Sequence, residues 1–305
     1  MSAKRTISTL FLTFLPQLLV PALASSCPHN FDHCLDASAP APSLRLPVKI
    51  YRDFLVVLEG QIGGDQFGVK LLHQNFVIDT GTAPSIINES VVKKLALHTS
   101  ASTLAAVGKT LVTHAAIVPE LTLGPVRVES LPVQVKNLAQ LEHDLGIPVA
   151  AIIGMDVLSQ SSFHLDYEKR EIEFGAISGQ GIPVPFDART GIAIAHLTLE
   201  GRPVRMLVDT GSDQLLVLGG NLAGPLQFAL LTTAQQGASV AQNNMAVEEF
   251  AARDIQFAGQ HFSREKAYFL ADAADPAFDG LLGVRALGFT GISFDQSRHT
   301  IYLQK

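Results

Sequence analysis

The sequence has no tryptophan, only two cysteines, and charged residues at only 16% of its 305 positions. Its net charge of −6 leaves no basic patch for nucleic acid, and this acidity is too mild to indicate a cationic partner. It contains no phosphate-binding loop, no Gly-x-Ser-x-Gly and no HExxH, and its ten histidines show no paired metal-ligand spacing. We therefore expect no metal, no cofactor and no nucleic-acid partner. Hydrophobic residues, at 47%, suffice for one large core or two moderate ones.

The two cysteines lie together in the stretch CPHNFDHC, from Cys27 to Cys34. In an exported chain, an even pair at this spacing predicts a local disulfide. A metal site that also uses His29 and His33 is the alternative. Neither interpretation involves the candidate catalytic residues described below.

The N-terminus has the pattern of a secretory signal peptide. Two basic residues precede a largely apolar, uncharged segment, Ile7–Ala24, which ends in Ala-Leu-Ala. We expect cleavage before Ser25 and a periplasmic or extracellular protein with no membrane span. The alternative is a retained membrane anchor, which Pro16 and Pro21 within the segment disfavour. A lipoprotein attached at Cys27 is a weaker alternative, because alanine rather than leucine lies three residues before that cysteine.

One sequence pattern occurs twice. FVIDTGTAPSII contains Asp79, and MLVDTGSDQLLV contains Asp209, 130 residues later. Downstream, AAIIGMDVL and DGLLGVRAL place Gly154 and Gly283 almost the same distance apart, and both segments continue to a matching aspartate and a short strand. Features that recur in register over more than 100 residues indicate a duplicated domain.

Short runs with alternating apolar residues, such as Val126–Val135, predict a mostly β fold with two lobes. Helices are predicted only at Ser85–Leu97 and Asn137–Gly146, and the lobes should join near Gly179–Asp187, where Gly and Pro gather. The absence of alternating βα units argues against a phosphoryl-transfer fold. The predicted parts are a signal peptide (1–24), an N-terminal extension with the Cys pair (25–46), a first lobe (47–177), a linker (178–190) and a second lobe (191–305).

Two carboxylates brought together by two-fold related lobes can share one proton, because like charges about 3 Å apart do not both ionise. Such a pair can activate water with one member and polarise a carbonyl with the other. The neighbours of Asp79 and Asp209 fit this chemistry. Gly81 and Gly211 leave backbone N–H groups accessible, Thr82 and Ser212 offer hydroxyl donors to the outer carboxylate oxygens, and Thr80 and Thr210 can join the two loops. These hydroxyls predict a pH optimum on the acidic side of neutral.

The doubled Asp-Thr-Gly-Thr/Ser, followed by Ile-Ile-Gly and Leu-Leu-Gly, resembles the aspartic proteases, whose carboxylate pair is a standard example of a shared proton. The short units and the ending DYEKREIEF are closest to retropepsin-like enzymes, over roughly Pro47–Gly175 and Gly191–Leu303. The resemblance implies a pepsin- or retropepsin-like two-lobed fold and an endopeptidase in which Asp79 and Asp209 hydrolyse peptide bonds. Because both halves lie in one chain, we expect a monomer that acts on a peptide or protein substrate.

The resemblance also implies that Ile152–Gly154 and Leu281–Gly283 support the catalytic loops. Hairpins over the cleft, called flaps, should lie near Thr103–Thr113 and Gly237–Ala246, although neither contains the tyrosine of pepsin-like flaps. Asp213 adds a further acid, which we expect to face solvent. The alternative function is a non-catalytic, exported peptide-binding or inhibitory protein. The intact pair of motifs argues against it.

Overall fold

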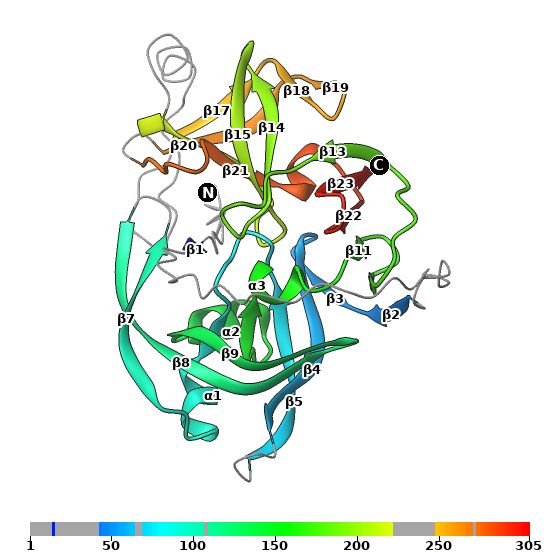
Figure 1. The fold of residues 1–305 in the computed structure, drawn as a ribbon. Coiled ribbons are helices and arrows are strands. Elements are labelled where there is room, and N and C mark those ends of the chain that lie inside the picture. Colours follow the sequence, from blue (N-terminus) through cyan, green and yellow to red (C-terminus); the bar gives the residue numbers. More distant parts are fainter. Residues whose placement is uncertain (1–13, 16–42, 65–68, 107–108, 222–247, 271–272) are drawn as a thin grey trace, which may run out of the picture.

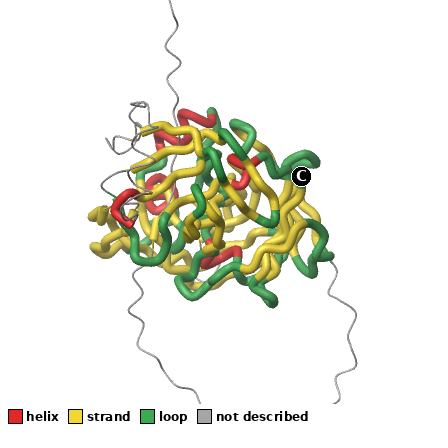
Figure 2. The backbone as a smooth tube through the Cα atoms, turned by 90° about the horizontal axis from the view of Figure 1, so that it is seen from above, coloured by secondary structure: helices red, strands yellow, loops and turns green. Residues whose placement is uncertain are grey.

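The protein folds into two β lobes joined by a third sheet (Figure 1). The computed structural model describes residues 14–15, 43–64, 69–106, 109–221, 248–270 and 273–305. Strands dominate the backbone, and the helices are short segments among them (Figure 2). The fold is therefore mostly β and two-lobed, as predicted. No helix in these ranges is long and apolar enough to cross a membrane.

The first lobe is built on one large sheet, in which β8 also pairs with β4 so that the sheet curls back on itself. In spatial order its strands are β1 (Phe14–Leu15), β7 (Thr99–Ala106), β8 (Lys109–Leu123), β9 (Val126–Lys136), β6 (Ile86–Asn88), β10 (Ala151–Ile153), β5 (Val69–Ile78), β4 (Leu55–Gly64) and β3 (Lys49–Tyr51).

The second lobe repeats this arrangement, with fewer strands among its described residues. In spatial order they are β17 (Glu248–Ala252), β20 (Glu265–Leu270), β16 (Leu215–Leu218), β21 (Gly280–Gly283), β15 (Arg202–Asp209), β14 (Ile194–Leu199), β18 (Ile255–Phe257) and β19 (Gln260–Phe262). At the centre of each lobe, a short apolar strand lies between a parallel and an antiparallel neighbour. β10 is parallel to β5 and antiparallel to β6, and β21 is parallel to β15 and antiparallel to β16. The shared topology establishes that the sequence repeat is a structural repeat.

A six-stranded sheet connects the lobes. Its strands, in spatial order, are β13 (Ile182–Pro185), β23 (Thr300–Gln304), β22 (Gly291–Asp295), β11 (Phe163–Asp166), β12 (Glu171–Phe174) and β2 (Leu44–Pro47). The seam between lobes is the antiparallel pair β11–β22, in which Phe163 is opposite Phe294 and their rings stack with centroids 4.8 Å apart. Both side chains are fully buried, so hydrophobic burial holds the lobes together at this seam.

The first predicted helix is shorter than expected. Residues Ile86–Asn88 form β6, and α1 covers only Glu89–Lys94, because the apolar residues before it are fully buried within the sheet. Asn88 caps α1 by accepting a hydrogen bond from the backbone N–H of Ser90. The second predicted helix corresponds to α2 (Ala139–Leu145). The remaining helical segments are α3 (Met155–Leu158), η2 (Gly219–Asn221) and η3 (Val284–Leu287).

Several predictions fall on residues outside the described ranges. These are the Cys27–Cys34 disulfide, most of the signal segment and the second flap at Gly237–Ala246. The first flap prediction coincides with the antiparallel pair β7–β8, in which Ala106 is paired with Lys109.

Candidate active site

The two candidate catalytic aspartates lie at the lobe interface with no solvent exposure. Asp79 directly follows β5, and Asp209 is the last residue of β15. A Cβ atom added to Gly81 would lie 2.6 Å from Asp209 Cγ, and one added to Gly211 would lie 2.7 Å from Asp79 Cγ. Each glycine thus faces the carboxyl group of the other lobe. This arrangement requires both positions to lack a side chain, and it brings the two carboxyl groups together.

Thr80 and Thr210 join the two catalytic loops by reciprocal hydrogen bonds. The backbone N–H of each residue donates to the hydroxyl of the other at 3.1 Å. The hydroxyls then donate across the interface, from Thr80 to the Val208 carbonyl at 2.8 Å and from Thr210 to the Ile78 carbonyl at 3.3 Å. Both threonines are fully buried, so these four bonds fix one loop relative to the other without competition from water.

The surroundings of the two carboxyl groups differ. In the first lobe, Asp79 Oδ1 accepts from the Gly81 N–H at 2.8 Å, and Asp79 Oδ2 accepts from the Thr82 hydroxyl at 2.8 Å. In the second lobe, Asp209 Oδ1 accepts from the Gly211 N–H at 2.7 Å. Asp209 Oδ2 is buried and receives no hydrogen bond within the described part of the chain.

The position of Ser212 explains this difference and departs from the expectation that it would match Thr82. Its hydroxyl oxygen accepts a hydrogen bond from the Gln214 N–H at 3.1 Å, and it makes no bond to Asp209 among the described contacts. Two acceptor oxygens can share a hydrogen bond only if one of them carries a proton. A proton on Asp209, facing Asp79, satisfies the buried oxygen that Ser212 leaves without a donor.

The pKa values of both groups rise, for related reasons. Burial raises the pKa of Asp79 from 3.8 to about 6, against the lowering effect of the hydrogen bonds from Thr82 and Gly81. Burial and the negative charge of Asp79 together raise the pKa of Asp209 well above its usual value. Both shifts favour the protonated form of the carboxyl group, and the pKa of Asp209 is raised further than that of Asp79.

The apolar-apolar-glycine segments lie directly behind the catalytic loops. A Cβ atom at Gly154 would come within 2.1 Å of the Thr82 carbonyl oxygen, and one at Gly283 within 2.4 Å of the Ser212 carbonyl oxygen. The Met155 N–H donates to the Thr82 carbonyl at 2.8 Å. The loops thus rest on these segments at a distance that only glycine permits.

The glycines were predicted from the sequence, but two residues near them, Asp156 and Arg285, were not. In the first lobe Asp156 accepts from the Ser85 hydroxyl at 2.7 Å and the Ser85 N–H at 2.9 Å, and Ser85 Oγ accepts from the Gly154 N–H at 2.9 Å. The corresponding residue of the second lobe is Arg285. It donates to the Asp53 carbonyl of the other lobe at 3.2 Å. The repeat places acidic Asp156 and basic Arg285 at equivalent positions. A comparison of the two halves therefore could not identify either residue.

Three further acids occupy structural positions. Asp166 and Asp295 accept backbone N–H groups of the turns that follow β11 and β22, as expected of turn residues. Asp213 is partly exposed, and its Oδ1 accepts from the Gln214 side chain at 2.6 Å. Across the described residues, no group of three or more His, Cys, Asp or Glu side chains is arranged to hold a metal ion.

A duplicated β fold whose two lobes each contribute one buried carboxyl group at their interface defines a two-lobed protein of the aspartic-protease class. The chain belongs to the aspartyl protease family, whose conserved pattern matches residues 58–157 in the first lobe and 195–286 in the second. The fold is similar to that of an aspartic proteinase from Irpex lacteus, with a TM-score of 0.50 and 13% sequence identity, over 87% of this chain and 97% of that one. No curated protein matches the sequence significantly.

Proposed function

We propose that the protein is an endopeptidase that hydrolyses peptide bonds with water activated by Asp79 and Asp209. The observation that carries this proposal is the contact between lobes: Gly81 faces the Asp209 carboxyl and Gly211 faces the Asp79 carboxyl. Membership of the aspartyl protease family supports it.

The asymmetry of the site assigns a role to each carboxyl group. Asp79, whose charge two donors stabilise, is the base that takes a proton from the attacking water. Asp209 is the acid that gives its proton to the oxygen of the scissile carbonyl, which yields a tetrahedral diol. When the C–N bond breaks, Asp79 passes its new proton to the leaving nitrogen and Asp209 recovers a proton from the diol. The sum is addition of one water across the peptide bond, with no covalent intermediate.

The test is incubation of the purified protein with an unfolded protein substrate between pH 4 and 7. A matched sample contains a peptide isostere in which a hydroxyl-bearing carbon replaces the scissile carbonyl. We expect cleavage that this inhibitor abolishes. Tight inhibitor binding without cleavage would instead establish the non-catalytic, peptide-binding alternative.

We also propose that the protein acts outside the cytoplasm, as a monomer on peptide or protein substrates. The apolar segment Ile7–Ala24 and its Ala-Leu-Ala ending support export. The pairing of both lobes within one chain supports a monomer, since neither catalytic carboxyl group has to come from a second copy.

A further inference from the structure

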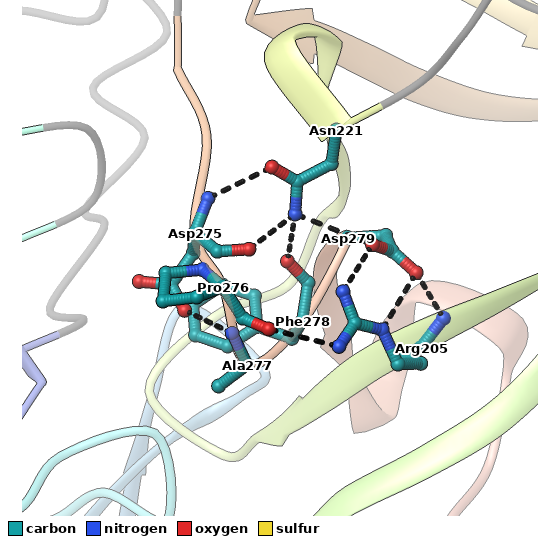
Figure 3. Close-up of polar contacts among 7 residues, drawn as sticks. All are labelled: Arg205, Asn221, Asp275, Pro276, Ala277, Phe278 and Asp279. Atoms are coloured by element: carbon teal, nitrogen blue, oxygen red, sulfur yellow. Dashed lines mark hydrogen bonds and ion pairs between the residues drawn. The ribbon is translucent and has the colours of Figure 1, made fainter.

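β21, the strand behind the second catalytic loop, is held at both ends. At its C-terminal end Gly283 lies beside Asp209 in the parallel pair with β15, and its N–H donates to the Gln214 carbonyl at 2.8 Å. Directly before its N-terminal end lies Asp279, in a network of polar side chains that the proposed chemistry does not use (Figure 3).

Asp279 forms a two-pronged ion pair with Arg205 of β15. Its Oδ1 accepts from Arg205 Nη2 at 2.8 Å, and its Oδ2 accepts from Arg205 Nε at 3.1 Å and from the Arg205 backbone N–H at 2.8 Å. In return, the Asp279 N–H donates to the Arg205 carbonyl at 2.7 Å. Burial opposes ionisation, yet the hydrogen bonds from Arg205 hold the pKa of Asp279 below its usual value. The pair therefore remains charged throughout the pH range proposed for activity.

Asn221, at the end of η2, forms hydrogen bonds with the same turn. Its Nδ2 lies within hydrogen-bonding distance of the carbonyls of Asp275 and Phe278 and of Asp279 Oδ1, and its Oδ1 accepts from the Asp275 N–H at 3.0 Å. Arg205 Nη1 adds a bond to the Pro276 carbonyl at 2.9 Å. Figure 3 shows how these side chains surround the turn 275–279 that leads into β21.

The first lobe has no ion pair at this place. Asn75 lies four residues before Asp79, as Arg205 lies four before Asp209, and it accepts the corresponding backbone bond from Ala150 at 2.9 Å. The Asn75 side chain donates to the Pro148 carbonyl at 3.0 Å. Ala150, which corresponds to Asp279, has no carboxylate to offer. An ion pair therefore fixes the start of β21, behind Asp209, whereas the start of β10, behind Asp79, has none among the described residues.

We infer that the Arg205–Asp279 pair, braced by Asn221, positions Asp209 by fixing where β21 lies along β15. The backbone of β21 packs closely against the catalytic loop at Gly283, because a Cβ atom there would lie 2.4 Å from the Ser212 carbonyl oxygen. A slip of one residue would move β21 by about 3.3 Å, and a misplacement of only about 1 Å can cost roughly a hundredfold in rate. These are positioning residues, and the inference rests on the proposed peptidase function.

The test variants are Asp279→Asn and the milder Arg205→Lys. Lysine keeps the positive charge but cannot form the two parallel hydrogen bonds of the guanidinium group. We expect Asp279→Asn to lower kcat about tenfold with KM nearly unchanged, and Arg205→Lys to lie between it and the wild type. Rates are counted per active site, titrated with the isostere inhibitor, so that unfolded molecules do not contribute. Carbon-13 NMR titration of the Asp79 and Asp209 carboxyl groups should show altered pKa values in both variants.

The matched control is Asp187→Asn. Arg189 also binds Asp187 through its backbone N–H, Nε and Nη2, but Arg189 is exposed, and neither residue belongs to β21 or to the turn before it. The control should leave kcat and the two carboxyl titrations unchanged. Reduced thermal stability of Asp279→Asn with wild-type kcat and titration would overturn the inference, because the pair would then be only structural. If the wild type cleaves nothing, the peptidase proposal fails, and the NMR titration still decides the positioning inference.

Discussion

The backbone N–H groups of Thr80 and Thr210 each donate to the hydroxyl of the other residue at 3.1 Å across the lobe interface. This reciprocal pair connects the two catalytic loops directly, so the distance between the carboxyl groups depends on how the lobes pair. Stability and activity should consequently respond together when it is changed.

Thr80→Val should destabilise the protein by about 2–5 kcal/mol, because the shape is kept while the Thr210 N–H and the Val208 carbonyl each lose a buried partner. Thr80→Ser, which retains the hydroxyl, should lose far less. Urea unfolding followed by circular dichroism measures both. Equal stability of the two variants would show that the hydroxyl bonds contribute little.

Asp79→Asn and Asp209→Asn should each abolish peptide hydrolysis while the chain stays folded, since an amide can neither carry the charge nor hold the shared proton. The double variant should be scarcely worse than either single one, as for residues that act as a unit. The control is Asp166→Asn, which removes the carboxylate that pairs with Lys169 and should affect stability more than turnover. Near-normal hydrolysis by either single active-site variant would refute the paired mechanism.

The rate of hydrolysis should follow a bell-shaped pH profile. Its acid limb should fall near the pKa of Asp79, about 6, because below that pH both carboxyl groups are protonated and no base remains. Thr82→Ala removes a donor to the ionised form and should move this limb to higher pH. Ser212→Ala should leave it in place, since that hydroxyl bonds Gln214 instead. Equal shifts in the two variants would contradict the asymmetry of the site.

Stability should change with pH in the direction opposite to that of an ion-paired acid. Both aspartates have pKa values raised above 3.8, so the folded state holds protons that the unfolded state has lost. Their contribution is therefore most favourable below about pH 4 and declines as pH rises, by roughly 1.4 kcal/mol per pH unit for each proton retained. Asp209→Asn removes the part of this decline that Asp209 contributes and should be more stable than the wild type at pH 7. Denaturant unfolding at pH 4 and 7 tests the sign.

The mature protein should begin near Ser25 and be found outside the cytoplasm. The basic start, the apolar run and the Ala-Leu-Ala ending motivate this expectation. Mass spectrometry of the purified native protein identifies its first residue. Residues 1–24 retained on a membrane-bound form would establish an anchor instead.

The sequence by itself determined the duplication, the two-lobed β fold and the identity of the paired aspartates. It could do so because the motifs around Asp79 and Asp209 recur in register, and two-fold related lobes impose the same local requirements on both copies. The glycines at 81, 154, 211 and 283 were visible for the same reason. Each marks a place where a Cβ atom would collide with the facing loop.

Only the tertiary structure decided what distinguishes the two halves. The repeat suggested that Ser212 would act as Thr82 does, yet its hydroxyl oxygen accepts from the Gln214 N–H, and Asp209 Oδ2 receives no hydrogen bond among the described residues. The hydroxyl neighbours alone predicted an acidic optimum, whereas complete burial raises the pKa of Asp79 to about 6. The Arg205–Asp279 pair joins residues 74 positions apart that have no charged counterparts in the first lobe. Burial and long-range contacts depend on how the chain packs. A comparison of the two halves of the sequence can identify only the features that both halves share.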